Sequence, residues 1–416
     1  MAMRVIFGLL LLSAAVRAQE AKTGPQGGVD QKRVDEAIQR GVAYLKSQGN
    51  VYSSDPQGAH ASELVLWTFV HAGLREGDAT FDALFKTMLA EPLKNTYRVS
   101  LQAMILEEIQ RVKYQQQIFR CAQFLIDNQC RNGQWAYGEA TTYPDPAADG
   151  VATGDPRPVG VREFGSPDAE AKPRVVRKLV VKRQRDGPET GDNSNAQYAA
   201  LGLRACQDAG IVLPREALQR ARTWWRDSQH VEDERPKEIR AAVPTGMGVV
   251  TGPPAGWCYG SRTHGHKAYG SMTAGAVGSL VIYGHLLGEK NPGREAAVLR
   301  GLQWLAREFT VTGNPGPSEH VPDSGWMSCY FLYALERAGI LCGVEKLGTH
   351  SWYAEGAAAL IRDQKPDGSW LSPHPHGDRS RELNSVWDTC FGILFLKRAT
   401  RPLQDVASTD RYHPGK

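Results

Sequence analysis

The sequence of 416 residues lacks the motifs that mark several common classes of enzyme. It contains no Gly-rich phosphate-binding loop and no Gly-x-Ser-x-Gly motif, which argues against a P-loop nucleotide-binding protein and against an α/β-hydrolase. Beyond the N-terminal segment, no apolar run is long enough to span a bilayer. Basic and acidic residues nearly balance, with 49 Lys and Arg against 45 Asp and Glu, so nucleic acid is not an expected partner.

The first 18 residues have the pattern of a secretory signal peptide. A basic start at Arg4 precedes an apolar stretch from Val5 to Leu12, and small residues lead to Ala18. We therefore expect a signal peptide over 1–18 and a flexible tail over 19–32. The mature protein is then secreted or periplasmic, with no membrane span.

The seven cysteines do not define a disulfide framework, because their number is odd. Four lie on apolar helical stretches, where a buried thiol is the ordinary interpretation: Cys121, Cys206, Cys329 and Cys390. Three lie near predicted loops and could pair in an oxidising compartment: Cys130, Cys258 and Cys342. No pairing is assigned.

One short phrase occurs twice. It reads Gln-x-x-x-Gly-x-Trp, from Gln129 to Trp135 and again from Gln364 to Trp370. A Gly just beyond the last helical turn supplies the left-handed residue that ends a helix. The Gln can bond to free carbonyls at the helix end, and the Trp can cover the turn while its indole N–H donates. The phrase therefore predicts a connection between one helix and its neighbour.

The remaining sequence alternates between amphipathic and wholly apolar helical stretches. The amphipathic ones, expected outside, cover 34–48, 81–89, 117–129, 214–229, 294–309 and 352–364. The apolar ones, expected inside, cover 61–73, 99–109, 194–208, 271–287, 327–338 and 386–397. Six such pairs favour a closed double ring over an open solenoid, because a solenoid needs polar caps and the last helix is as apolar as the middle ones.

With the two phrases, which match the QW motif, the chain from Val34 to Arg401 resembles the terpenoid cyclase and protein prenyltransferase superfamily. The resemblance, to squalene cyclase-like repeat proteins in particular, implies an all-α fold. It implies an α/α toroid of about six inner–outer helix pairs over 33–401, followed by a C-terminal tail over 402–416.

Two segments interrupt the helical pattern. Residues 139–191 are Pro-rich and carry seven basic residues and no acidic one between Lys172 and Arg185, which indicates a disordered or loose insertion in the third pair. The Val-rich run from Arg174 to Lys182 is also compatible with an exposed hairpin strand. Residues 231–268 form a second insertion, and Gly256-Trp257 near its end has the pattern of a connection displaced by that insertion.

In such a toroid the N-termini of the inner helices converge on one mouth of the ring, where their free N–H groups gather. Residues at these helix starts are the candidates for a site. The expected lining residues are Tyr97, Arg98, Asp192, Asn195, Tyr269, Trp326, Tyr330 and Trp387. The aromatic residues among them suit a cation or a hydrocarbon. They are equally compatible with a filled barrel core.

Asp388 and Asp323 are the candidate catalytic acids, each near the start of an inner helix. For each Asp alone, a helix-capping role is the stronger interpretation. The Asp-x-Asp-Asp acid motif of the squalene cyclases is absent, which argues against squalene cyclisation. The Cys-Gly-Glu-Gln thioester of toroid-containing complement proteins is also absent.

A zinc site is a further hypothesis that the resemblance implies. Prenyltransferases hold zinc with an Asp-x-Cys pair and a His on a neighbouring inner helix. Asp388 and Cys390 have that spacing, and closure of the ring brings the last inner helix beside the first, where His60 stands. Three such ligands with an open fourth position would form a catalytic type of zinc site.

Two functions remain open at this point. The first is an exported toroid that binds a small hydrophobic ligand or a protein partner in its cavity. The second is an enzyme of cyclase, prenyltransferase or lyase type that uses inner-helix carboxylates or zinc. A cavity with facing carboxylates or a metal favours the enzyme, and a cavity filled by side chains favours the binding protein.

Overall fold

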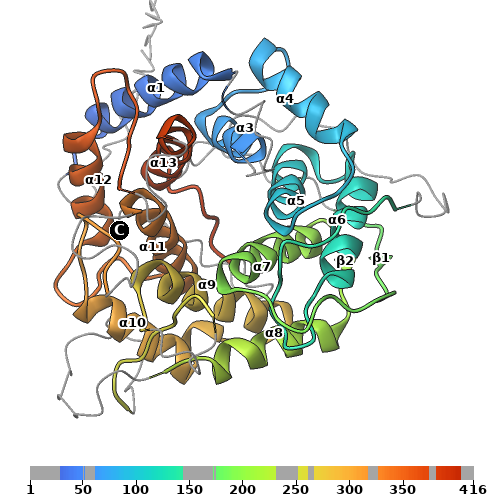
Figure 1. Ribbon diagram of the computed structural model, residues 1–416. Coiled ribbons are helices and arrows are strands. Elements are labelled where there is room, and N and C mark those ends of the chain that lie inside the picture. Colours follow the sequence, from blue (N-terminus) through green and yellow to red (C-terminus); the bar gives the residue numbers. More distant parts are fainter. Residues whose placement is uncertain are drawn as a thin grey trace, which may run out of the picture.

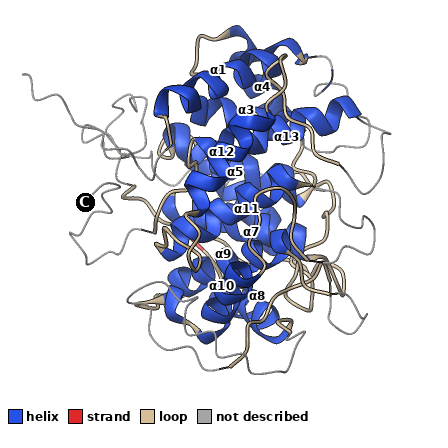
Figure 2. Ribbon diagram, turned by 90° about the vertical axis from the view of Figure 1, so that its left-hand side faces the viewer, coloured by secondary structure: helices blue, strands red, loops and turns tan. Residues whose placement is uncertain are grey.

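The computed structural model describes residues 29–49, 51, 61–143, 172, 175–230, 252–260, 267–316, 327–373 and 381–403. These residues form twelve α-helices in two concentric layers (Figure 1). Loops make up nearly all of the rest (Figure 2). The predicted signal peptide, most of the 19–32 tail and residues 404–416 lie outside the described residues.

The inner layer is a closed ring of six helices. They are α3 (Ala61–Ala72), α5 (Thr96–Gln110), α7 (Asn193–Asp208), α9 (Gly270–Leu286), α11 (Ser328–Cys342) and α13 (Arg381–Leu396). Each contacts the next, and α13 contacts α3. The predicted all-α toroid is therefore confirmed, and the open solenoid is excluded.

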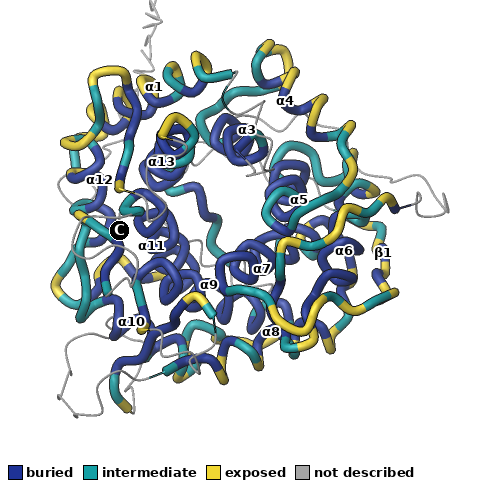
Figure 3. The backbone as a smooth tube through the Cα atoms, in the orientation of Figure 1, coloured by how far each residue is buried: buried dark blue, intermediate teal, exposed yellow. Residues whose placement is uncertain are grey.

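The outer layer sheathes this ring. It consists of α1 (Gln31–Ser47), α4 (Ala79–Ala90), α6 (Gln115–Asp127), α8 (Arg215–Asp227), α10 (Ala296–Arg307) and α12 (Trp352–Asp363). A short 3₁₀ helix, η2 (Pro292–Arg294), precedes α10. Inner helices are buried almost all round, whereas outer helices bury one stripe and expose the opposite face (Figure 3). This difference follows from the sequence pattern, since a helix that is apolar on every side must be buried on every side.

The second Gln-x-x-x-Gly-x-Trp phrase joins the last outer helix to the first. Gln364 Nε2 donates to the carbonyl of Ala37 in α1 at 2.8 Å and to that of Gly368 at 2.9 Å. The indole N–H of Trp370 donates to the carbonyl of Leu360 at 2.8 Å. We call this arrangement a clasp.

The first phrase forms the same clasp between α6 and α8. Gln129 Nε2 donates to the carbonyl of Ala217 in α8 at 2.9 Å, and the indole of Trp135 donates to that of Leu125 at 2.7 Å. As in the other copy, the Trp reaches the carbonyl four residues before the Gln. Each Gln therefore links two consecutive outer helices, and each Trp secures the turn between them.

A third clasp confirms the displaced connection predicted near Trp257. Gln229 donates to the carbonyl of Ala297 in α10 at 2.8 Å, and the Trp257 indole donates to the carbonyl of Trp225 at 2.8 Å. The indole N–H again donates to the carbonyl of the residue four positions before the Gln. The clasp therefore tolerates a long insertion between its two halves.

The described part of the first insertion packs closely along α6, contrary to the expectation of a loose segment. The backbone N–H of Gln184 donates to Asp127 Oδ1 at 2.8 Å, and that of Gly187 donates to the carbonyl of Gln129 at 3.0 Å. The strand β1 (Leu179–Val180) pairs in parallel with β2 (Ile211–Val212) and forms no hairpin. Residues 175–191 of the insertion therefore form an extended strap along α6.

The chain after α13 crosses the ring on the side where the inner helices end (Figure 1). Arg204, in the last turns of α7, donates to the carbonyls of Arg401 and Pro402 at 2.8 and 2.9 Å. Thr400 donates from its backbone N and its hydroxyl to Glu336 of α11 at 3.0 and 2.7 Å. This segment covers the C-terminal end of the barrel, so the end at which the inner helices begin is the candidate for a site.

None of the seven cysteines forms a disulfide, and all are buried. Among the described residues, no helix combines the length and the hydropathy that crossing a membrane requires.

Candidate functional site

Ser194, in the first turn of α7, is the centre of a hydroxyl network at the N-terminal end of the barrel. Tyr97 of α5 donates its hydroxyl to Ser194 Oγ, and the hydroxyl of Tyr259 lies 3.1 Å from the same oxygen. Ser194 in turn donates to Asp192 Oδ1 at 2.9 Å. Ser194 thus accepts from Tyr97, and its single proton can be given to Asp192 or to the Tyr259 hydroxyl.

Asp192 is the N-cap of α7, as its structural interpretation predicted. Its Oδ1 accepts from the backbone N of Asn195 at 2.8 Å, and its Oδ2 accepts from Asn195 Nδ2 at 2.8 Å. With the Ser194 bond, this carboxylate accepts three hydrogen bonds. Asp192 and Asn195 therefore position Ser194.

Tyrosines from several elements surround this network. Tyr137 and Tyr259 lie in loops and are 54% and 44% exposed, so their ring faces reach solvent. The Tyr97 ring lies 6.3 Å from that of Tyr137 and 4.6 Å from that of Tyr198, measured between centroids. We call the set Tyr97, Tyr137, Tyr259, Tyr269 and Tyr330, together with Ser194, the tyrosine mouth.

The tyrosines of the mouth are neutral at physiological pH. Burial raises the pKa of Tyr97, Tyr269 and Tyr330 well above the ordinary value of 10.0, and the negative charge of Asp192 adds to the effect on the first two. Their hydroxyl groups therefore act as hydrogen-bonding groups and not as bases.

Below the mouth, side chains from helices two places apart in the ring meet inside the barrel. Gln197 of α7 donates to the hydroxyl of Tyr330 of α11 at 2.8 Å, and Arg337 Nη2 donates to Gln197 Oε1 at 2.8 Å. From α3, the indole of Trp67 donates to the hydroxyl of Tyr333 at 3.2 Å. These helices are not neighbours in the ring, so the contacts cross its centre.

The middle of the barrel is therefore filled at this level by aromatic and polar side chains. Phe391 of α13 packs against both Tyr330 and Tyr333, with centroids 5.2 and 5.9 Å apart. Trp67 and Tyr198 are buried core residues. A large hydrocarbon chamber does not fit this arrangement.

Arg98, predicted to line the mouth, is neutralised by two carboxylates. Its Nε and Nη2 donate to Glu63 Oε1 at 2.8 and 2.6 Å, and Nη2 lies 2.7 Å from Glu91 Oε2. This ion pair fastens the start of α5 to α3. Arg98 therefore has a positioning role beside the mouth.

Asp388 and Cys390 belong to the scaffold in the described structure. Because α13 begins at Arg381, Asp388 lies inside the helix and not at its start. It accepts from the backbone N and hydroxyl of Ser372 at 2.6 and 2.7 Å, which fastens the loop after the clasp. Sequence periodicity missed the start because the first helical residues are exposed and polar.

The Asp388 and Cys390 side chains do not converge on a common position. The Cys390 thiol bonds to Thr68 of α3, and burial raises its pKa to about 12. The third predicted ligand, His60, lies outside the described residues. The described residues contain no group of three or more His, Cys, Asp or Glu side chains that could hold a metal.

Three candidates, His60, Asp323 and Trp326, lie outside the described residues. Trp387 lies partly buried in α13 against the core. The structure thus unites Tyr97, Asp192, Asn195, Tyr269 and Tyr330, and it separates Asp388 and Cys390 from them.

Sequence reasoning missed Tyr137, Tyr259, Gln197 and Arg337. A signal for the first two exists: each stands two residues after a clasp Trp, at Trp135 and at Trp257. The clasp therefore delivers the residue two positions after its Trp to the start of an inner helix. In the clasp of Gln364 and Trp370 that position is Ser372, which binds Asp388 within α13.

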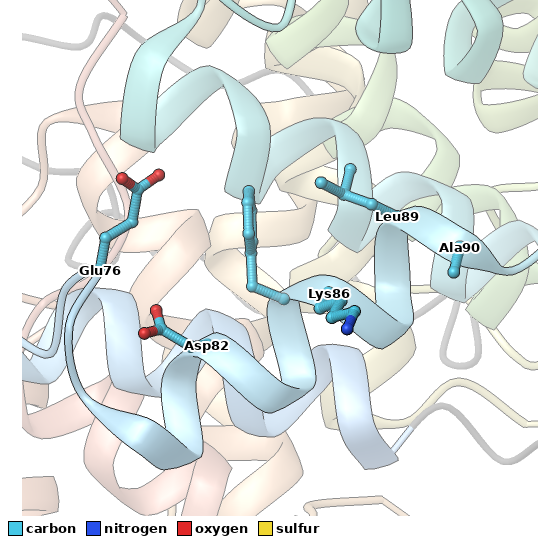
Figure 4. Close-up of a pocket in the computed structure, with 6 residues that line it drawn as sticks. Glu76, Asp82, Lys86, Leu89 and Ala90 are labelled. Carbon is cyan, nitrogen blue, oxygen red and sulfur yellow. The ribbon is translucent and has the colours of Figure 1, made fainter.

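A hollow of about 550 Å³ lies on the outer surface beside α4 (Figure 4). It is lined by Glu76, Asp82, Phe85, Lys86, Leu89 and Ala90. Asp82 accepts from the backbone N of Gly77 at 3.1 Å, and Glu76 lies 3.6 Å from Lys113. Its carboxylates thus serve local turns and ion pairs, and the hollow is open to solvent.

No protein-family model matches the chain, and no curated protein matches its sequence. Among solved structures, it is similar to one described as a possible member of the GH105 family from Salmonella enterica, with 12% identity and a TM-score of 0.48 over 90% of this chain and 96% of that one. It is also similar to the GH76A α-1,6-mannanase of Salegentibacter, with 10% identity and a TM-score of 0.45 over 89% of this chain and 98% of that one. A type II terpene cyclase from Scytonema has 12% identity and a TM-score of 0.30 over 89% of this chain and 97% of that one. Similarity at these values says nothing about a substrate.

Proposed function

We propose that the protein is a ligand-binding toroid and that its site is the tyrosine mouth. The observation that carries the proposal is Tyr259, whose hydroxyl bonds to Ser194 while 44% of its surface stays exposed. Tyr137 offers a second exposed ring nearby. Tyrosine gives a large apolar face at low entropic cost and a polar edge, which suits reversible binding.

The chemistry of the mouth favours a ligand with hydrogen-bond donors. The Tyr259 oxygen lies 3.1 Å from Ser194 Oγ and can accept a further hydrogen bond from a ligand. The carboxylate of Asp192 lies behind Ser194 and makes the local potential negative. Hydroxyl or amino groups on a ligand with an apolar face fit this arrangement better than a plain hydrocarbon does.

Acid catalysis receives no support from the carboxylates described at this end of the barrel. Asp192 accepts three hydrogen bonds, and Glu63 is paired with Arg98. A general acid needs a raised pKa and access to the substrate. An enzyme that uses Asp323 or His60 stays a prediction of the sequence, since both lie outside the described residues.

From the sequence, we further propose that the protein is exported and is a squalene cyclase-like repeat protein. An exported binding protein meets its ligand outside the cytosol, where small polar molecules are plentiful. Detection of the mature N-terminus at Gln19 in secreted or periplasmic protein tests the export.

Native mass spectrometry of the purified protein tests the binding function. We expect a bound small molecule in wild type and at equal occupancy in Tyr114→Phe, which removes a hydroxyl on the outer surface beside Glu76. Tyr259→Phe and Tyr137→Ala should lower the affinity for that molecule about five- to tenfold, as the loss of one contact group does. Equal occupancy in all four proteins, or no bound molecule in wild type, contradicts the proposal.

A further inference from the structure

Arg337 is a buried cation without a carboxylate partner among the described residues. It lies on α11 and is 3% exposed. Nη2 donates to Gln197 Oε1 at 2.8 Å, while Nη1 is buried and has no hydrogen-bond acceptor. The rings of Tyr333 and Tyr198 flank the guanidinium, with centroids 4.3 and 5.6 Å from Cζ.

No neighbouring group neutralises this charge fully. The carboxylate of Glu336, the preceding residue, is held by Thr400 on the covered end of the barrel and makes no ion pair with Arg337. Burial raises the pKa of Tyr198 and of Tyr330, so both are uncharged near neutral pH. The guanidinium itself keeps its proton at any physiological pH.

Two other arginines with little exposed side chain each have carboxylate partners. Arg222 is paired with Glu289 and with Glu295. Arg98 is paired with Glu63 and Glu91. An uncompensated buried charge is strongly destabilising, and Arg337 lacks the carboxylate partners that Arg222 and Arg98 have.

The guanidinium lies close beneath the tyrosine mouth. Its acceptor, Gln197, stands three residues after Ser194 on the same face of α7, which is about one helical turn of ~5 Å. Gln197 also binds the hydroxyl of Tyr330, at the floor of the mouth. Gln197 thus connects the mouth, about one turn above it on α7, to Arg337 on α11.

We propose that the ligand of the tyrosine mouth carries an oxyanion, a carboxylate, sulfate or phosphate, which accepts hydrogen bonds from Arg337. This inference rests on the proposed function and assigns a ligand class to it. Donor groups on the ligand face Tyr259 and Tyr137, and its acidic group accepts from Nη1 of Arg337, which has no acceptor among the described residues. The anion supplies the negative counter-charge that Arg337 lacks among the described residues.

Thermal unfolding in added anions tests the inference. Dialysed protein is titrated with sodium acetate, sulfate or phosphate, and sodium chloride holds ionic strength constant. In wild type, the Tm should rise with the logarithm of at least one oxyanion concentration, as binding to the folded state requires. Which of the three anions acts identifies the acidic group.

Two variants make the test specific. Arg337→Gln should abolish the anion-dependent rise. Gln197→Glu places a carboxylate against Arg337 with little change of shape, so it should raise the Tm in anion-free buffer and also abolish the rise. Lys290→Gln removes an exposed positive charge in the loop after the C-terminal end of α9, and it should behave as wild type.

Failure of the inference differs from failure of the proposed function. If no oxyanion raises the wild-type Tm, or if the rise persists in Gln197→Glu, Arg337 is not an anion site. If a neutral molecule co-purifies and its occupancy falls in Tyr259→Phe, the binding function stands and only the ligand class is wrong. If neither Tyr259→Phe nor Tyr137→Ala changes any bound molecule, the mouth itself is not the site.

Discussion

Gln364 at the end of α12 donates to the carbonyl of Ala37 in α1 and so ties the last outer helix to the first. More than three hundred residues separate the two in the chain. The same side chain in the same role ties α6 to α8 through Gln129 and α8 to α10 through Gln229. The ring is thus closed by one local device used three times.

Gln364→Ala should destabilise the protein by about 1–2 kcal/mol, because the Ala37 and Gly368 carbonyls lose their donor in a partly buried setting. Urea unfolding at equilibrium measures the change. Gln116→Ala, on the exposed face of α6, is the matched control and should lie within about 0.5 kcal/mol of wild type. Equal effects of the two variants would show that the clasp contributes nothing to closure.

Gly368→Ala should be more destabilising than Gly343→Ala. Both glycines have positive φ, 89° and 65°, so both variants incur a left-handed penalty of about 1–2 kcal/mol. At Gly368 an added Cβ would also lie 2.4 Å from the carbonyl oxygen of Arg40, whereas at Gly343 nothing lies within 4 Å. The difference in unfolding free energy between the two variants measures the close approach of the loop after α12 to α1. Equal unfolding free energies for the two variants would refute the importance of that approach.

Glu336 should make stability fall as pH rises towards neutrality. Burial raises its pKa from the ordinary 4.5 to about 7. Between these two pH values the folded protein holds a proton that the unfolded chain has released, so the folded state is progressively disfavoured as pH rises. The effect is on the order of 3 kcal/mol when complete.

Glu336→Gln mimics the protonated side chain and removes this term. Compared with wild type, the variant should gain stability as pH is raised from about 5 to about 8. Chemical denaturation at several pH values measures the gap between the two proteins. A gap that does not change with pH would show that Glu336 does not titrate in this range.

Cys390→Ser should leave the zinc content of the purified protein unchanged. Cys390 bonds to Thr68, whereas Asp388 holds Ser372, so the pair does not form the start of a metal site. Inductively coupled plasma mass spectrometry of both proteins, prepared in parallel, measures the zinc content. One equivalent of zinc in wild type that is lost in the variant would restore the metal hypothesis.

Much of the architecture was predictable because it depends on local patterns. Gln-x-x-x-Gly-x-Trp encodes both the helix end and the link to the next outer helix, and the apolar character of 271–287 encodes burial on all sides. Trp257 was recognisable despite the insertion before it, since the chemistry of its turn is local.

The site was less predictable because it depends on which helices face each other across the ring. Arg337 follows Glu336 in the sequence, a pattern typical of an exposed helix surface. Arg337 contacts Gln197, on a helix two places away, only because the ring is closed. Glu336, the preceding residue, instead accepts a hydrogen bond from Thr400. Asp388 was assigned to the rim because the polar start of α13 carries no apolar signal, so the helix was expected to begin five residues too late.

The most direct test of the account is a crystal structure of the native protein with its co-purified ligand. We predict density over Tyr137 and Tyr259, with a donor group within hydrogen-bond distance of the Tyr259 hydroxyl. An empty mouth with the ligand bound elsewhere, such as in the hollow beside Phe85, would contradict it.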